Sequence, residues 1–98
     1  MITTNSRTRK TTFSLDIPDA SKVFLVGEFN NWSQKKNPMR KLKGMWQISL
    51  PLKPGEYKFK YLADSTWQND PVAHKYCTSP FGGDDSVVVV PDYPVIKR

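Results

Sequence analysis

Two tryptophans, Trp32 and Trp67, have the side-chain type and the setting that best suit a recognition site. Trp32 lies in the polar segment Asn30 to Ser33, and Trp67 follows the turn residues Asp64 to Thr66. Neither has the alternating apolar neighbours of a buried strand position. A hexose has a flat face of C–H groups ringed by hydroxyls, and an exposed aromatic ring can stack on that face. Both tryptophans are therefore candidate platforms for a sugar.

Lys60 is a candidate for the same surface. It lies in an uninterrupted stretch, residues 56–70, that alternates with period two. Three aromatic residues share one parity of this stretch, namely Tyr57, Phe59 and Tyr61. Because successive side chains of a strand point to opposite faces, Lys60 should point away from these aromatics and toward the side that could carry Trp67. The alternative is an ordinary solvent-exposed lysine.

Short strands must position these residues. The chain has 98 residues, 38% hydrophobic and 24% charged, which suits one globular domain. Eight prolines and five glycines leave little room for helices. Apolar runs and period-two alternation predict five or six strands, around residues 13–17, 23–26, 46–50, 57–63 and 87–90. We predict an all-β fold, an antiparallel sandwich or small barrel, with the alternating Trp46 in its core.

Charge is concentrated outside the predicted strands. The net charge is +6, and residues 1–12 and 35–43 contribute +3 and +5. We predict a disordered basic tail at residues 1–12, a folded domain at residues 13–92 and a C-terminal tail at residues 93–98. An Arg-rich and Ser-rich start without acidic residues is also typical of an organelle transit peptide, although twelve residues is short for one.

The number of cysteines and the length of the apolar stretches indicate the cellular compartment. The single cysteine, Cys77, excludes an internal disulfide and favours a reducing compartment. The sequence contains neither an apolar stretch long enough to span a membrane nor a secretory signal. We therefore expect a cytoplasmic protein with no membrane partner.

Patterns for catalysis and metal binding are weak. His74 and Cys77 have no third group to orient them as base and nucleophile, and one His with one Cys is too few for a transition-metal site. Asp84 and Asp85 are adjacent, so their carboxylates should diverge on an extended strand instead of flanking a glycosidic bond. We expect no enzyme activity, no metal site and no cofactor.

Four motifs follow one another along most of the chain, at Val23 to Trp32, Gly55 to Trp67, Asn69 to Pro71 and Phe81 to Val88. Their order resembles carbohydrate-binding module family 48. That family contains the glycogen-binding domain of the AMP-activated protein kinase beta subunit and the N-terminal early-set domains of isoamylases and glycogen branching enzymes. The resemblance implies an immunoglobulin-like β-sandwich that binds alpha-1,4-linked glucan such as glycogen, starch or maltodextrin.

The resemblance also implies roles for individual residues. Trp32 and Trp67 would be the two stacking platforms, and Lys60 would hydrogen-bond to sugar hydroxyls. Phe81 would supply an apolar contact that reaches past the glucan. Asp85 stands where the family commonly has asparagine, and because an ionised carboxylate accepts but does not donate hydrogen bonds, one contact must be rearranged.

Two other functions are compatible with the sequence. One is a protein-interaction or targeting module for a glucan-metabolising enzyme, with the sandwich edge or residues 35–43 as the contact. The other is a single-stranded nucleic-acid binder, because residues 57–61 interleave aromatic and basic side chains. Parity argues against nucleic acid, since such a platform needs its rings and cations on one face.

Overall fold

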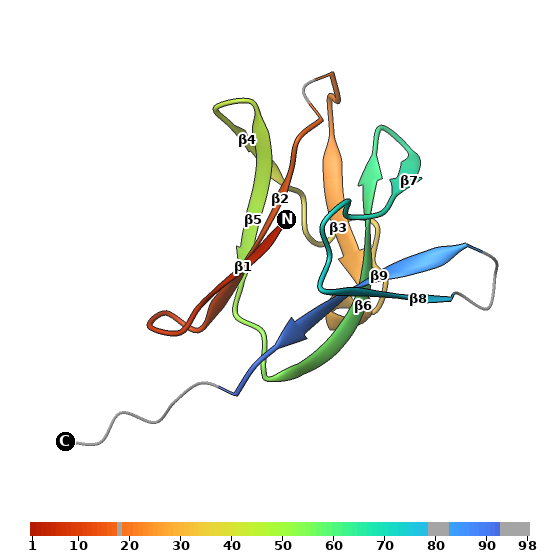
Figure 1. The fold of residues 1–98 in the computed structure, drawn as a ribbon. Helices are drawn as coiled ribbons and strands as arrows, with labels where there is room; N and C mark the ends of the chain where they lie inside the picture. The colour runs from red at the N-terminus through yellow and green to blue at the C-terminus, as the bar shows by residue number, and fades with distance from the viewer. Residues whose placement is uncertain (18, 79–82, 93–98) are drawn as a thin grey trace.

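The computed structural model describes residues 1–17, 19–78 and 83–92, and Figure 1 shows their fold. The predicted C-terminal tail, residues 93–98, lies outside this part of the chain. The described strands are β1 (Ile2–Asn5), β2 (Lys10–Leu15), β3 (Val23–Gly27), β4 (Arg40–Leu42), β5 (Met45–Leu50), β6 (Gly55–Ala63), β7 (Thr66–Gln68), β8 (Lys75–Thr78) and β9 (Asp84–Val90). One short 3-10 turn, η1 (Glu28–Asn30), follows β3, and the described residues contain no α-helix.

The strands form two antiparallel sheets that face each other (Figure 1). The first sheet has the order β1-β2-β5-β4, and the second has the order β3-β6-β9-β8. The short strand β7 also pairs with β6, next to the residues that pair with β9. The predicted all-β, immunoglobulin-like antiparallel sandwich is confirmed.

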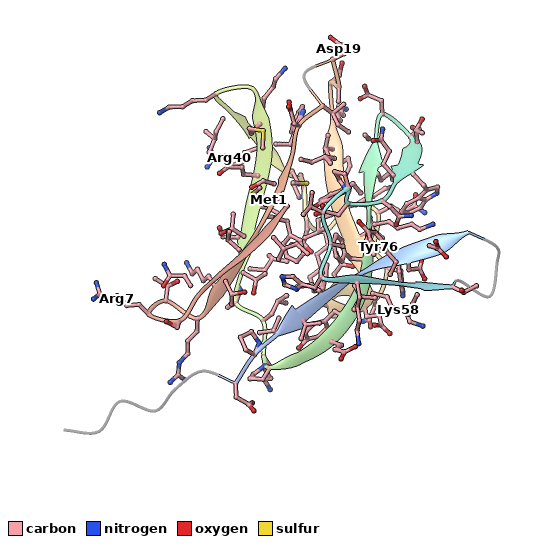
Figure 2. All side chains as sticks on the ribbon, viewed as in Figure 1. Met1, Arg7, Asp19, Arg40, Lys58 and Tyr76 are labelled. Carbon is pink, nitrogen blue, oxygen red and sulfur yellow. The ribbon has the colours of Figure 1, made fainter. Side chains whose placement is uncertain are left out.

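The core lies between the inner faces of the two sheets, where side chains fill the space (Figure 2). Phe13 of the first sheet meets Phe59 of the second nearly edge-on, with ring centroids 5.1 Å apart, and Phe59 meets Tyr61 at 5.6 Å. Trp46 is 7% exposed, and its indole Nε1 donates a hydrogen bond to the Ile17 carbonyl at 3.1 Å. The prediction that Trp46 belongs to the core is confirmed, and its polar atom has the partner that burial requires.

The predicted disordered tail at residues 1–12 is wrong, because β1 and β2 form a hairpin there. Ile2 is the Cα partner of Phe13 and is buried, so the core reaches almost to the N-terminus. The Asn5 carbonyl closes the turn by accepting the Arg9 N–H at 2.7 Å. Threonine-rich segments favour strands once a partner strand is present. The folded domain therefore starts before residue 13.

A buried carboxylate, Asp70, ties the segment after β7 to the core. Tyr61 donates its phenol O–H to Asp70 Oδ2 at 2.7 Å, and the Val72 N–H donates to Oδ1 at 2.8 Å. The Asp70 N–H donates to Ser86 Oγ at 2.8 Å, and the Met1 amino group lies 2.8 Å from both carboxylate oxygens. Burial, reinforced by the Asp70 carboxylate, raises the pKa of the Tyr61 phenol far above its ordinary value. The phenol therefore remains a hydrogen-bond donor.

Candidate functional site

The outer face of the second sheet carries three of the predicted site residues, Lys60, Trp67 and Asp85. In β6, Phe59 and Tyr61 are fully buried toward the core, which leaves Lys60 and Leu62 on the opposite face, as parity predicted. The buried rings cannot serve as the stacking platform that a single-stranded nucleic acid would need. Val26 is the Cα partner of Lys60 and is buried, although it does not belong to the main core cluster. The outer face is therefore apolar at its centre.

Trp67 lies on β7 and is 45% exposed. Its Cα partner on β6 is Leu62, and directly opposed residues of an antiparallel pair share a face. Lys60 is two residues away from Leu62, so it lies diagonally from Trp67 on that same face. The turn between the strands consists of Asp64 and Ser65, with φ of 47° and 68°, which is typical of a two-residue hairpin. The hairpin brings Trp67 and Lys60 together.

Trp32 is held by the tight connection that follows β3. Its N–H donates to the Gly27 carbonyl at 2.8 Å, and the residue is 39% exposed. Gly27 has no room for a side chain, because a Cβ would lie 2.7 Å from the Lys58 carbonyl oxygen and 2.8 Å from the Phe59 Cβ. This close approach anchors the Trp32 backbone at the level of Phe59 on β6. Trp67 is anchored three rows further along, opposite Leu62, so Lys60 lies between the levels on β6 at which the two tryptophans are anchored.

The Asn30 side chain fixes the loop that carries Trp32. Asn30 is 5% exposed, and its Oδ1 accepts the Gly27 N–H at 3.1 Å. Its Nδ2 donates to the Leu25 carbonyl at 2.9 Å and to Asn37 Oδ1 at 2.7 Å. Sequence reasoning missed this role, because it treated the polar segment around Trp32 as a simple exposed loop. An asparagine beside a tight glycine was the available signal.

Lys60 and Asp85 form an ion pair on the outer face, with Nζ 3.6 Å from Oδ1. Asp85 lies on β9 opposite Cys77 of β8. Because the distance exceeds that of a direct hydrogen bond, both groups keep hydrogen-bonding capacity for a further partner. The Lys60 side chain is 22% exposed and the Asp85 side chain 10%, so Lys60 is the more accessible of the two. An ammonium that donates beside a carboxylate that accepts suits a hydroxyl, which does both. Phe81, the remaining predicted site residue, lies outside the described residues.

A hollow that the sequence did not reveal lies at the end of this face. Its volume is about 320 Å³, and it is lined by Lys22, Phe24, Leu62, Asp64 and Ser65. The available signal was the run Val23 to Val26, which is apolar on both parities and so predicts a strand that is covered on both faces.

The residues considered for catalysis are separated or engaged elsewhere. Asp84 and Asp85 pair with successive residues of β8, so their side chains point to opposite faces. His74 Nδ1 accepts the Val89 N–H at 2.9 Å. Within the described ranges, no group of three or more His, Cys, Asp and Glu residues could hold a metal ion. The same described ranges contain no helix that is long enough and apolar enough to cross a membrane.

Comparison with known families identifies the kind of domain. A family model described as the glycogen recognition site of AMP-activated protein kinase matches residues 10–92, which is most of the chain. The chain belongs to this family. The glycogen-recognition domain described here is thus a glucan-binding module, and the resemblance seen in its motifs is confirmed.

Several curated relatives share this glycogen-recognition domain. The AMP-activated protein kinase subunit beta-1 of Sus scrofa is 35% identical over 69 residues, covering 70% of this chain and 54% of that protein. The chloroplastic protein FLOURY ENDOSPERM 6 of Oryza sativa subsp. japonica is 38% identical over 53 residues, covering 54% of this chain and 10% of that protein. A 1,4-alpha-glucan branching enzyme of Rhizobium johnstonii is 40% identical over 76 residues, covering 69% of this chain and 10% of that protein. The chain therefore spans between about a tenth and about half of the length of these relatives.

Proposed function

We propose that this domain binds alpha-1,4-linked glucan across the outer face of its second sheet, with Trp32 and Trp67 stacking on sugar rings. One observation supports this proposal: the exposed Trp67 shares a face with the donor and acceptor pair of Lys60 and Asp85, and the exposed Trp32 follows the neighbouring strand β3. The rings suit the C–H faces of successive glucosyl units, and the ion pair suits their hydroxyls. Phe81 would add the apolar contact that the family resemblance implies.

The proposed contacts support weak binding. Two stacked rings contribute about 1 to 1.5 kcal/mol each, and a few exposed hydrogen bonds add about 0.5 to 1.5 kcal/mol each. The ordering of the glucan and the side chains offsets part of this sum. We expect a dissociation constant between about 1 μM and 1 mM, which corresponds to roughly −8 to −4 kcal/mol.

The domain is proposed to bind glucan without cleaving it. Glycoside hydrolysis needs two carboxylates on either side of one bond. Asp85 lies on the proposed face and is paired with Lys60, whereas its neighbour Asp84 has the opposite parity on β9. No release of reducing sugar from soluble starch is therefore expected from the purified domain.

A second candidate is a contact with a glucan-metabolising enzyme. The basic segment 35–43 includes β4, the edge strand of the first sheet, whose three residues are all exposed. Arg40 projects from this sheet, whereas Lys58 belongs to the second (Figure 2), so such a contact would leave the glucan face free. Two relatives, FLOURY ENDOSPERM 6 of Oryza sativa subsp. japonica and PTST homolog 2 of Arabidopsis thaliana, are named as chloroplastic proteins. Both cytoplasm and plastid suit the unpaired Cys77, and we retain the cytoplasm as the proposed location.

Isothermal titration calorimetry with beta-cyclodextrin and with maltoheptaose tests the glucan proposal. The wild-type domain should bind both, and Trp32→Ala and Trp67→Ala should each weaken binding by about five- to tenfold. Leu42→Ala is the matched control, because Leu42 is an exposed apolar residue of the first sheet. Full affinity in both tryptophan variants would show that the proposed face is wrong. A pull-down from cell extract with and without maltodextrin distinguishes direct glucan binding from protein binding alone.

A further inference from the structure

The hollow beside the turn between β6 and β7 is open to a ligand on the same face as the proposed glucan site. Phe24 and Leu62 are Cα partners on β3 and β6, and Leu62 and Trp67 are Cα partners on β6 and β7. Residues opposed in this way share a face. Phe24, Leu62 and Trp67 therefore form one apolar row across three neighbouring strands. The hollow, lined by the first two, adjoins the Trp67 platform.

The other lining residues place polar groups around this apolar floor. Asp64 is held in place, because its carboxylate accepts the N–H of Ser21 at 2.9 and 3.0 Å and that of Lys22 at 2.8 Å. These accepted hydrogen bonds lower the pKa of the Asp64 carboxyl. A carboxylate offers about four lone-pair positions, so Asp64 can also accept from a ligand. The ammonium of Lys22 and the hydroxyl of Ser65 add donors.

Ser65 is a further indication that the turn serves more than chain reversal. Its φ is 68°, and both turn positions are in the left-handed region, where glycine or asparagine is favoured. A serine at this position is less favourable for the backbone than glycine or asparagine, but it places a hydroxyl next to the hollow. Backbone conformations of this kind are often retained where a side chain has a role.

We infer that the hollow is an additional subsite for a neutral glucosyl unit, which extends the glucan face beyond Trp67. The inference rests on the proposed function. Lys22 and Asp64 carry opposite charges, so the lining has no excess charge that would select an ionic ligand. A volume of about 320 Å³ is at the lower end of the range for small-molecule sites. A glucan stacked on Trp67 and running along the row toward Phe24 would place its next unit in the hollow.

A comparison of linear and cyclic ligands tests the subsite. The variant Lys22→Ala/Ser65→Gly removes two polar groups from the lining, and glycine is preferred at the positive φ of residue 65, so folding is retained. Affinities for maltotetraose, maltoheptaose and beta-cyclodextrin are measured by calorimetry. The closed ring of beta-cyclodextrin can cover Trp32 and Trp67 but cannot extend a chain end into the hollow. Lys53→Ala is the matched control, because Lys53 is an exposed lysine that precedes β6, far from the turn between β6 and β7.

The wild-type and control domains should bind maltoheptaose more tightly than maltotetraose. In the double variant, the ratio of the affinity for maltoheptaose to that for maltotetraose should fall by about two- to tenfold, while the affinity for beta-cyclodextrin is unchanged. An unchanged ratio of the two linear affinities in the double variant would overturn the subsite alone. Failure of the wild-type domain to bind beta-cyclodextrin at all would overturn the proposed function and the subsite with it.

Discussion

Replacement of Asn30 by alanine tests how the fold positions the Trp32 platform. The change removes one acceptor and two donated hydrogen bonds, which join the Gly27 N–H, the Leu25 carbonyl and Asn37. Gly27 and Leu25 are buried, so water does not readily replace the lost partner. A buried polar group left unpaired costs about 1 to 3 kcal/mol. For the two backbone groups together, the free energy of unfolding should fall by about 2 to 6 kcal/mol.

The same replacement should weaken glucan binding although Asn30 is buried and cannot touch the ligand. Without the Asn30 amide, the connection between Gly27 and Trp32 loses the bonds that hold it in one conformation. The Trp32 ring then contributes less stacking, and a loss of about 1 to 1.5 kcal/mol corresponds to about five- to tenfold weaker binding. Urea unfolding measures the stability, and calorimetry with beta-cyclodextrin measures the affinity.

Asn5→Ala is the matched control. Asn5 is exposed, and its Oδ1 also accepts backbone N–H groups, but in the turn between β1 and β2. Its loss should cost about 1 kcal/mol or less and leave the affinity unchanged. The reasoning would be refuted if Asn30→Ala were no less stable than Asn5→Ala, or if it were destabilised as expected but bound glucan with full affinity.

Three further outcomes are expected. Trp46→Ala should lower the free energy of unfolding by about 3 to 5 kcal/mol and change the affinity for glucan little. Trp32→Ala and Trp67→Ala should lower the free energy of unfolding by less. Equal losses in the three variants, measured by urea unfolding, would contradict this contrast. Because glucan is neutral, its dissociation constant should change by less than about twofold between about 50 and 200 mM salt, and a steep salt dependence in calorimetry would instead indicate a polyanionic ligand. The folded-state pKa of Asp64 is lowered by accepted N–H groups, so its stabilising contribution is present above the unfolded value of about 4 and is lost as pH falls through the folded value. The stability difference between wild type and Asp64→Asn should therefore shrink on acidification, and a constant difference from pH 7 to pH 2 would argue against it.

The long strands were predictable because their side chains alternate. In β6, the buried Phe59 and Tyr61 and the outward Lys60 follow parity alone. The short strands were not predictable in this way. All residues of β4 are exposed, and β7 has only three residues, so their strand conformation depends on pairing with β5 and β6. The hairpin at the N-terminus was missed for a related reason, since Ile2 gains its burial only by pairing opposite Phe13.

The candidate site was predictable in its residue types but not in its construction. An exposed setting for Trp32 and Trp67 follows from their polar neighbours, and the structure brings Lys60 and Asp85 to the same face. The buried network of Asn30 depends on contacts across the chain that no local pattern encodes. The hollow likewise depends on the register that aligns β3, β6 and β7, and register is set by the whole sheet.

Nuclear magnetic resonance of the indole N–H groups tests the central claim most directly. The chain has three tryptophans and therefore three such signals, which single Trp→Phe variants assign. Trp46 is an internal reference, because its indole N–H is bonded to the Ile17 carbonyl inside the fold. On titration with beta-cyclodextrin, the signals of Trp32 and Trp67 should shift together and saturate with one dissociation constant, while that of Trp46 stays in place. Binding of beta-cyclodextrin without a shift of the Trp32 and Trp67 signals would contradict the assignment of the glucan site to the outer face of the second sheet.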